Sequence, residues 1–163
     1  MTILSQDLTD LAEQVIAANR ASGRIVALAE SCTGGLVAAA LTEVAGSSAV
    51  LDRGFVTYSN ESKQELLGVP RDIIDAFGAV SIACAWSMAQ GALRHSNADV
   101  AIAISGIAGP DGGTAQKPIG TVVFARAVRG SDELVAEERL LDGQTRSEIR
   151  RQAALVALEL LLP

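Results

Sequence analysis

The chain has 163 residues, of which 49% are hydrophobic, 3% aromatic and 20% charged. This composition excludes a disordered chain, and the length suits one domain with its own core, which we expect to span residues 1–163. The net charge is −6 and the pI about 4.7, and the sequence contains no basic run. These charges argue against nucleic acid as the main partner.

Neither the N-terminus nor the cysteines indicate export or membrane insertion. The opening MTILSQDLTDLAEQ lacks the basic and long apolar parts of a signal peptide. No apolar window reaches the roughly 18–20 residues that a membrane span needs. The two cysteines, Cys32 and Cys84, do not make a disulfide framework. We therefore expect a cytoplasmic protein with no membrane partner.

Hydrophobic periodicity predicts five elements in the first half of the chain. In chain order they are a helix over 5–21, a buried strand over 24–29, a helix over 33–44, a strand over 50–58 and a short helix within SNESKQELLGVP. The first helix is ended by Ser22 and Gly23. The short helix takes Ser59 or Asn60 as its N-cap and is stopped by Gly68 and Pro70.

The second half continues the alternation of helices and strands. In chain order we predict helices over 71–77 and 81–94, a strand over 98–105, a glycine-rich loop over 106–120, strands over 121–128 and 133–140, and a helix from about Thr145. The helix over 81–94 is rich in small residues that suit close packing on a sheet. The last two strands form a hairpin, which adds antiparallel pairing. The prediction is an α/β fold, a three-layer α/β/α sandwich with a mixed central sheet.

Three segments carry more glycine and polar residues than a core needs, and each follows a predicted strand. They are residues 30–35, 57–63 and 105–120. Ligands of open α/β sheets gather at the carboxyl ends of the strands. If the three strands are neighbours, these segments meet at one site.

The first of these segments lies within AESCTGG and places Ser31 between a strand and a helix opened by Thr33, Gly34 and Gly35. Backbone N–H groups at a helix start can stabilise an oxyanion or a phosphate, so Ser31 is a candidate nucleophile. The alternative is that Ser31 or Thr33 only caps the helix, which is the commoner role for such a segment taken alone. Cys32 is a rival nucleophile, although a small packed cysteine is the more common case.

A serine nucleophile needs a base. The only histidine, His95, lies in the polar stretch RHSNAD, so a Ser-His-Asp triad has little support. Lys63, one of two lysines, lies in the first turn of a predicted helix, where the helix dipole disfavours its ammonium form. Partial burial would lower its pKa further toward that of a general base. Tyr58, the only tyrosine, could relay a proton or orient the lysine. The alternative is a solvated lysine beside a tyrosine at a strand end.

Other polar groups are less specific. The loop over 106–120 could form an anion nest, but it matches neither a Walker A loop nor GxGxxG. Arg146 and Arg150, one helical turn apart, either hold a phosphate or carboxylate together or are solvated with Glu148 between them. Asp111 alone would make a weak Mg²⁺ contact, and no zinc set is present. We therefore expect no metal and no cofactor.

Four stretches, AESCTGGLVAAALTEVAGSS, GFVTYSNESKQELLGVP, GAVS and SGIAGPDGGTAQKPIGTV, resemble the CinA C-terminal domain family of nicotinamide-nucleotide amidases over about residues 5–162. The resemblance implies the family's fold and deamidation of nicotinamide mononucleotide in pyridine nucleotide salvage. It also implies a metal-independent serine-lysine mechanism. The chain departs from the family's pattern at Ile82, where glutamate often follows GAVS, and in DGQTR. Because it has no counterpart of the N-terminal domain of full-length CinA proteins, we expect the amidase activity alone.

Carried over by motif, Ser31 would be the nucleophile, Lys63 the base and Tyr58 a supporting group. The resemblance also implies substrate contacts by Ser105, Gly106, Ala108, Gly109 and Arg146, and we add Glu30, Thr33, Gly34 and Gly35 from the segment around Ser31. The partner would be a small nucleotide substrate, and the Ala-rich helices leave room for a homo-oligomer. Two alternatives stay open: a non-catalytic nucleotide- or partner-binding module of the competence/damage-inducible type, and an amidase for another small amide.

Overall fold

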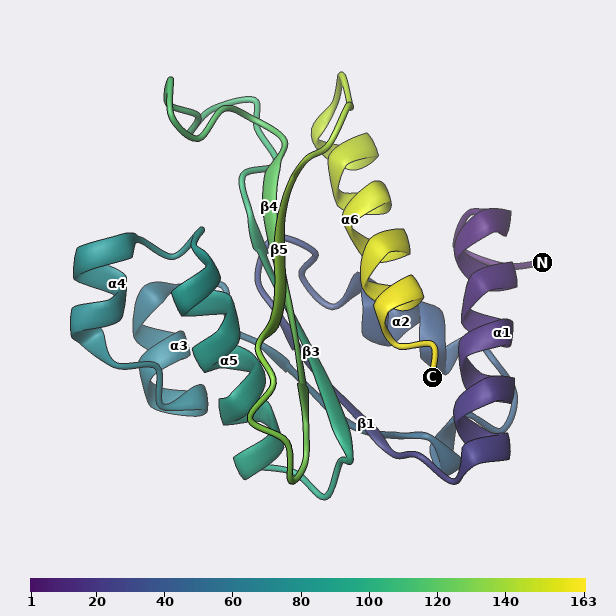
Figure 1. Ribbon diagram of the computed structural model, residues 1–163. Coiled ribbons are helices and arrows are strands. Elements are labelled where there is room, and N and C mark those ends of the chain that lie inside the picture. The colour runs from purple at the N-terminus through teal and green to yellow at the C-terminus, as the bar shows by residue number, and fades with distance from the viewer.

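The computed structural model describes residues 1–163 and arranges them as helices on both faces of a central sheet (Figure 1). The α/β/α fold with a mixed sheet is confirmed. In chain order the elements are α1 (Gln6–Ser22), β1 (Val26–Glu30), α2 (Leu36–Thr42), a 3-10 turn (Ser47–Ala49), β2 (Leu51–Val56), α3 (Asn60–Leu67), α4 (Arg71–Phe77), α5 (Ile82–Arg94), β3 (Val100–Gly106), β4 (Thr121–Val128), β5 (Val135–Leu140) and α6 (Arg146–Leu160). No helix combines the length and the apolar character needed to cross a membrane.

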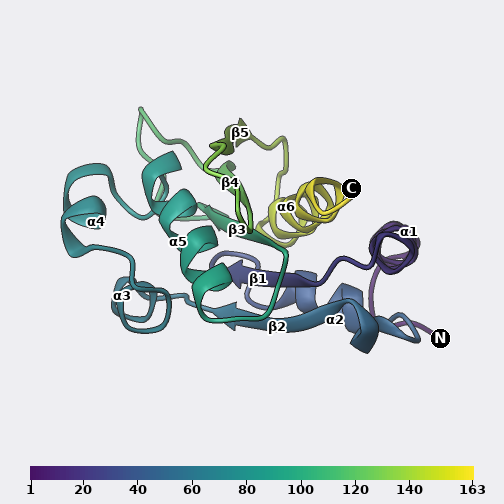
Figure 2. The same cartoon turned by 60° about the horizontal axis from the view of Figure 1, so that its bottom comes forward.

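The strand order, β2-β1-β3-β4-β5, determines where a ligand can bind (Figure 2). Strands β2, β1 and β3 are parallel, whereas β4 and β5 add antiparallel pairs. The carboxyl ends of the three parallel strands therefore lie side by side at one edge of the sheet. The polar segments that follow these strands converge there, as the sequence predicted.

The two faces of the sheet differ in the size of their side chains. Strand β3 directs Ile102 and Ile104 into the core shared with α1, α2 and α6, whereas Ala101 and Ala103 belong to the core under α5. Because side chains alternate along a strand, one strand supplies both faces. The alanine face lets α5 approach the sheet closely, which agrees with the small residues of that helix.

Gly91 of α5 allows this helix to touch the end of α3, which carries Lys63. A Cβ at position 91 would lie 2.8 Å from the carbonyl carbon of Leu67 and closer still to its oxygen. We expect Gly91→Ala to lower the free energy of unfolding by about 1–3 kcal/mol through overpacking. The clash outweighs the preference of helices for alanine over glycine, which is about 1 kcal/mol.

Urea denaturation of the variant measures this loss, and Gly54→Ala is the matched control. A Cβ at Gly54 would meet no atom closer than 3.6 Å, so this variant should unfold close to the parent midpoint. Equal midpoints for Gly91→Ala and the parent would show that α3 and α5 adjust freely.

Candidate active site

Ser31 leaves β1 in a sharp turn that holds its side chain at the edge of the sheet. Its N–H donates to Ile104 O at 2.9 Å, so the turn is bonded to β3, and its carbonyl accepts from Gly34 N–H at 3.0 Å. Gly34 and Gly35 have φ of +58° and +96°. Only glycine adopts such angles without strain, so the two glycines permit the turn. The side chain of Ser31 is 7% exposed.

The helix after this turn begins at Leu36, later than the predicted start at residue 33, because neither serine nor threonine caps it. The carboxylate of Glu30 accepts from Val37 N–H at 3.0 Å and from Ala38 N–H at 3.1 Å. Glu30 therefore acts as the cap and completes the helix start. The alternative of capping by Ser31 or Thr33 is therefore wrong, and both carboxylate oxygens of Glu30, an expected substrate contact, are bonded to the helix start.

Arg150 lies beneath the same turn and does not join Arg146 at an anion site. Its Nε donates to Cys32 O and its Nη2 to Thr33 O, both at 3.1 Å. Of the two alternatives left open for these arginines, neither describes Arg150, because it is occupied by backbone carbonyls. These two hydrogen bonds tie α6 to the turn that carries Ser31.

Lys63 reaches Ser31 from α3. Ser59 caps this helix through a bond from Ser62 N–H, which places Lys63 near the helix start. Lys63 is 1% exposed, and its Nζ lies 3.0 Å from Ser31 Oγ. Nζ also donates to Thr57 O at 2.7 Å and to Tyr58 O at 3.3 Å. The two expected partners are thus in hydrogen-bond contact, and no carboxylate forms an ion pair with Lys63.

Burial changes the pKa of both reactive groups near Ser31. Desolvation lowers the pKa of Lys63 from its ordinary value of 10.5, which favours the neutral amine that a base requires. Burial raises the pKa of Cys32 to about 11, so its thiol stays protonated. Since the thiolate is the reactive form of cysteine, Cys32 is a poor nucleophile here.

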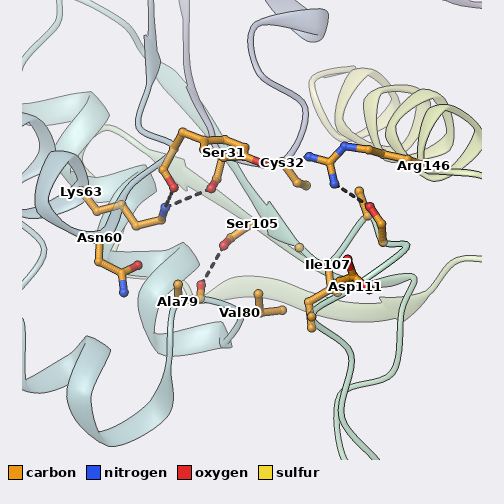
Figure 3. Close-up of a pocket in the computed structure, with 15 residues that line it drawn as sticks. Ser31, Cys32, Asn60, Lys63, Ala79, Val80, Ser105, Ile107, Asp111 and Arg146 are labelled. Carbon is orange, nitrogen blue, oxygen red and sulfur yellow. Dashed lines mark hydrogen bonds between the residues drawn. The ribbon is translucent and has the colours of Figure 1, made fainter.

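A cavity of about 270 Å³ opens in front of Ser31 and Lys63 (Figure 3). Its volume lies near the lower end for ligand pockets, which suits a small molecule. The lining comes from the ends of β1 and β3, the start of α3, the α4–α5 connection, the glycine-rich loop and the start of α6. The residues are Ser31, Cys32, Tyr58, Asn60, Lys63, Ala79, Val80, Ser105, Gly106, Ile107, Ala108, Gly109, Asp111, Gly112 and Arg146.

Of the expected substrate contacts, five line this cavity: Ser105, Gly106, Ala108, Gly109 and Arg146. Ser105 does so with an engaged hydroxyl, which donates to Ala79 O at 2.8 Å. The remaining expected contacts, Glu30, Thr33, Gly34 and Gly35, are not among the lining residues. Of the residues in this turn, only Ser31 and Cys32 therefore line the cavity.

Tyr58 differs from expectation in its contacts. Its phenol accepts from Arg146 Nη2 at 2.7 Å, and Arg146 Nη1 donates to Gly109 O. Only the backbone carbonyl of Tyr58 reaches Lys63. The phenol of Tyr58 therefore makes no contact with Ser31 or Lys63. Tyr58 orients Lys63 through its backbone carbonyl and Arg146 through its phenol oxygen.

Several backbone N–H groups near Ser31 have no protein partner and could bind an oxyanion, among them those of Cys32 and Gly106. Cys32 N–H donates to no protein atom. Gly106 lies opposite Val122 at a position where β3 and β4 exchange no hydrogen bonds, so its N–H points toward β1. The acceptor expected there is Ser31 O, which accepts from Gly34 N–H instead and leaves Gly106 N–H without a partner. A Cβ at Gly106 would lie 2.7 Å from Val122, so this strand end requires glycine. At the start of α2 Glu30 occupies the N–H groups of Val37 and Ala38, whereas those of Thr33 and Gly35 donate to no protein atom.

Several cavity residues were not anticipated as substrate contacts from the sequence. Asn60 had appeared only as a possible helix cap, and Asp111 only as a weak cation ligand. His95 Nδ1–H donates to Gly91 O at 2.8 Å, and His95 does not line the cavity. The structure contains no group of three or more histidine, cysteine, aspartate or glutamate side chains that could hold a metal ion.

Comparisons with known proteins show what this chain is similar to. A model of the CinA C-terminal domain matches residues 8–163. The chain is 49% identical to the nicotinamide-nucleotide amidohydrolase PncC of Enterobacter agglomerans over 93% of its length and 92% of the relative. It is also 49% identical to PncC of Escherichia coli, with coverages of 95% and 93%.

Solved structures extend the similarity to three dimensions. The competence/damage-inducible protein CihA of Agrobacterium tumefaciens superposes with a TM-score of 0.95 at 47% identity, covering 99% of this chain and 97% of that one. A CinA superfamily protein of Klebsiella pneumoniae superposes with a TM-score of 0.90 at 40% identity, and 96% of each chain is covered.

Proposed function

The chain belongs to the CinA C-terminal domain family, and we propose that it hydrolyses the carboxamide of nicotinamide mononucleotide to give nicotinate mononucleotide and ammonia. The observation that carries the proposal is the buried contact of 3.0 Å between Lys63 Nζ and Ser31 Oγ in a small-molecule cavity. We propose that residues 1–163 act as one amidase domain in the cytoplasm. The net charge of −6 supports a small-molecule substrate rather than nucleic acid.

The proposed first step is attack by Ser31 on the carboxamide carbon. In neutral Lys63 the two N–H groups donate to Thr57 O and Tyr58 O, which leaves the nitrogen lone pair directed at the Ser31 hydroxyl. The hydroxyl proton moves to Lys63 Nζ as the oxygen–carbon bond forms. The two carbonyls then accept from the ammonium that results, so the lysine keeps its position throughout.

The carboxamide oxygen becomes an oxyanion in this step. The unbonded N–H groups of Cys32, which follows Ser31, and of Gly106, at the end of the neighbouring strand β3, support our assignment of an oxyanion hole to them. A donor from the residue after the nucleophile is the arrangement that serine hydrolases use. Each such donor is worth about 3–4 kcal/mol of the barrier.

The second half of the reaction regenerates Ser31 and Lys63 in their starting protonation states. The carbon–nitrogen bond breaks, and Lys63 gives its proton to the departing nitrogen, which leaves as ammonia. Water then transfers a proton to Lys63 and attacks the ester carbon. Ser31 Oγ leaves, regains its proton from Lys63, and the nicotinate product is released.

A substrate panel tests the proposed function directly. We expect ammonia release, measured with a coupled glutamate dehydrogenase assay, to have its highest kcat/KM with nicotinamide mononucleotide. Nicotinamide riboside and free nicotinamide lack groups that Arg146 and the cavity mouth can bind, so we expect losses of about 10-fold or more with each.

The panel also separates the alternatives. Equal rates with free nicotinamide would indicate an amidase for a small amide without nucleotide selectivity. Binding of nicotinamide mononucleotide in calorimetry without release of ammonia would indicate a non-catalytic nucleotide-binding module.

A further inference from the structure

Asp111 is the only carboxylate among the residues that line the cavity. It is exposed, and its side chain takes part in no hydrogen bond and no ion pair with the protein, although Arg146 lines the same cavity. Both ends of the Arg146 guanidinium are instead bonded to Gly109 O and Tyr58 Oη. Asp111 therefore presents free acceptor oxygens to a ligand.

The loop that carries Asp111 is held before this residue by the bond from Arg146 to Gly109 O and after it by Thr114 and Lys117. Thr114 and Lys117 bond each other through Thr114 N–H to Lys117 O and Lys117 N–H to Thr114 Oγ1. The ammonium of Lys117 donates to Phe77 O and Val80 O in the α4–α5 connection. These bonds hold the loop against the rest of the cavity wall, so Asp111 has a defined position at the cavity.

The position of Asp111 within the cavity indicates which part of a substrate it meets. Figure 3 shows Asp111 and Arg146 together on the side away from Lys63. With the carboxamide at Ser31 beside Lys63, the part of the cavity left for the ribose and phosphate is the side that holds Asp111 and Arg146. The groups attached to the ring nitrogen therefore reach Asp111 and Arg146.

We propose that Asp111 accepts hydrogen bonds from the ribose hydroxyls of a nucleotide substrate and so selects for an intact ribose. This inference rests on the proposed function and names the part of the substrate that is recognised. A carboxylate only accepts hydrogen bonds and would repel the phosphate, so the phosphate lies toward Arg146. Acidic side chains bind ribose hydroxyls in dinucleotide-binding folds by the same chemistry.

The test compares two substrates, nicotinamide mononucleotide and its 2′,3′-dideoxyribose analogue, with the parent and Asp111→Ala. We expect the substitution to lower kcat/KM about 10–100-fold with the ribose substrate, which is the loss expected for hydrogen bonds to a charged acceptor. With the dideoxy analogue the two proteins should agree within about 2-fold. Equal losses with both substrates, or no loss with either, would overturn the assignment.

Two further variants sharpen the result. Asp132→Ala removes an exposed carboxylate in the β4–β5 connection, outside the cavity, and should behave as the parent with both substrates. Asp111→Asn keeps an acceptor oxygen without the charge and should lose less than Asp111→Ala.

A binding measurement separates this inference from the proposed function. Calorimetry of Ser31→Ala and of Ser31→Ala with Asp111→Ala, titrated with both substrates, needs no turnover. Discrimination by Asp111 in binding, with no ammonia release by the parent, would refute the amidase and keep the ribose site. Ammonia release by the parent without that discrimination would refute the ribose site and keep the amidase.

Discussion

Replacing Ser31 with alanine is expected to lower kcat for ammonia release from nicotinamide mononucleotide by about 10³-fold or more, as the loss of a nucleophile does in serine hydrolases. No neighbouring group can replace the hydroxyl, because burial holds the pKa of the Cys32 thiol at about 11. The substitution removes one hydrogen bond, that to Lys63, so the fold should be retained. Circular dichroism and a denaturation curve check the fold, and the ammonia assay checks the rate.

Cys32→Ala is the matched control for this prediction. It changes the adjacent residue, which lines the same cavity, but removes no group that the proposed mechanism uses; only the Cys32 backbone N–H has a role there. We expect this variant to stay within about 10-fold of the parent rate. The assignment of Ser31 fails if Ser31→Ala keeps the parent rate, and it transfers to Cys32 if the two variants exchange their effects.

The order of elements and the place of the site were predictable because both follow from local patterns. Helical periodicity, the glycine after Ser22 and the capping residue Ser59 fix most element limits within two residues. The parallel order β2-β1-β3 then brings three polar loops to one edge. Lys63 was predictable as the partner of Ser31 because the chain has only two lysines and one of them begins a helix after a neighbouring strand.

Contacts that depend on how side chains turn back onto the backbone or onto other elements were not predictable from local patterns. The pattern AESCTGG favours a serine or threonine cap, but the carboxylate of Glu30 occupies the helix start and displaces both. Likewise, Arg146 and Arg150 share a helix face by spacing, but the turn after β1 captures Arg150. Tyr58 bonds Arg146, which lies 88 positions later in the sequence, and hydrophobic periodicity cannot predict such a contact.

The second large effect is expected at Lys63. Lys63→Met removes the proposed base at nearly constant side-chain length and should lower kcat by about 10²–10⁴-fold, the range that general base catalysis contributes. Lys63→Arg keeps a cation that cannot deprotonate, so it should be as slow as Lys63→Met at every pH. Activity of Lys63→Arg near the parent rate would show that the position needs a positive charge rather than a base.

The pH dependence of the parent distinguishes a base from a fixed cation. Neutral Lys63 is the active form, so kcat/KM should rise with pH as the amine deprotonates. Desolvation lowers the pKa of Lys63, which moves this rise below the ordinary value of 10.5. The variants Lys63→Met and Lys63→Arg should show no such rise, and a rise that persists in either would assign the titration to another group.

The lowered pKa of Lys63 also predicts how stability changes with pH. Because this pKa is lower in the folded than in the unfolded protein, the unfolded chain binds the extra proton between the two values. The free energy of unfolding of the parent therefore rises with pH across this interval and levels off above 10.5. Lys63→Met lacks this titration, so its stability relative to the parent should be highest below the folded pKa. Within the interval this relative stability should fall by about 1.4 kcal/mol for each pH unit.

Denaturation of the parent and of Lys63→Met at several pH values up to 10.5 measures this difference in the free energy of unfolding. The difference reports Lys63 and the two thiols that interact with its charge, Cys32 and Cys84, because every other titrating group is common to the two proteins. A difference that does not change with pH would mean that Lys63 is not desolvated in the folded protein. It would also remove the physical reason for a neutral amine beside Ser31, so the stability measurement tests the proposed base without any turnover.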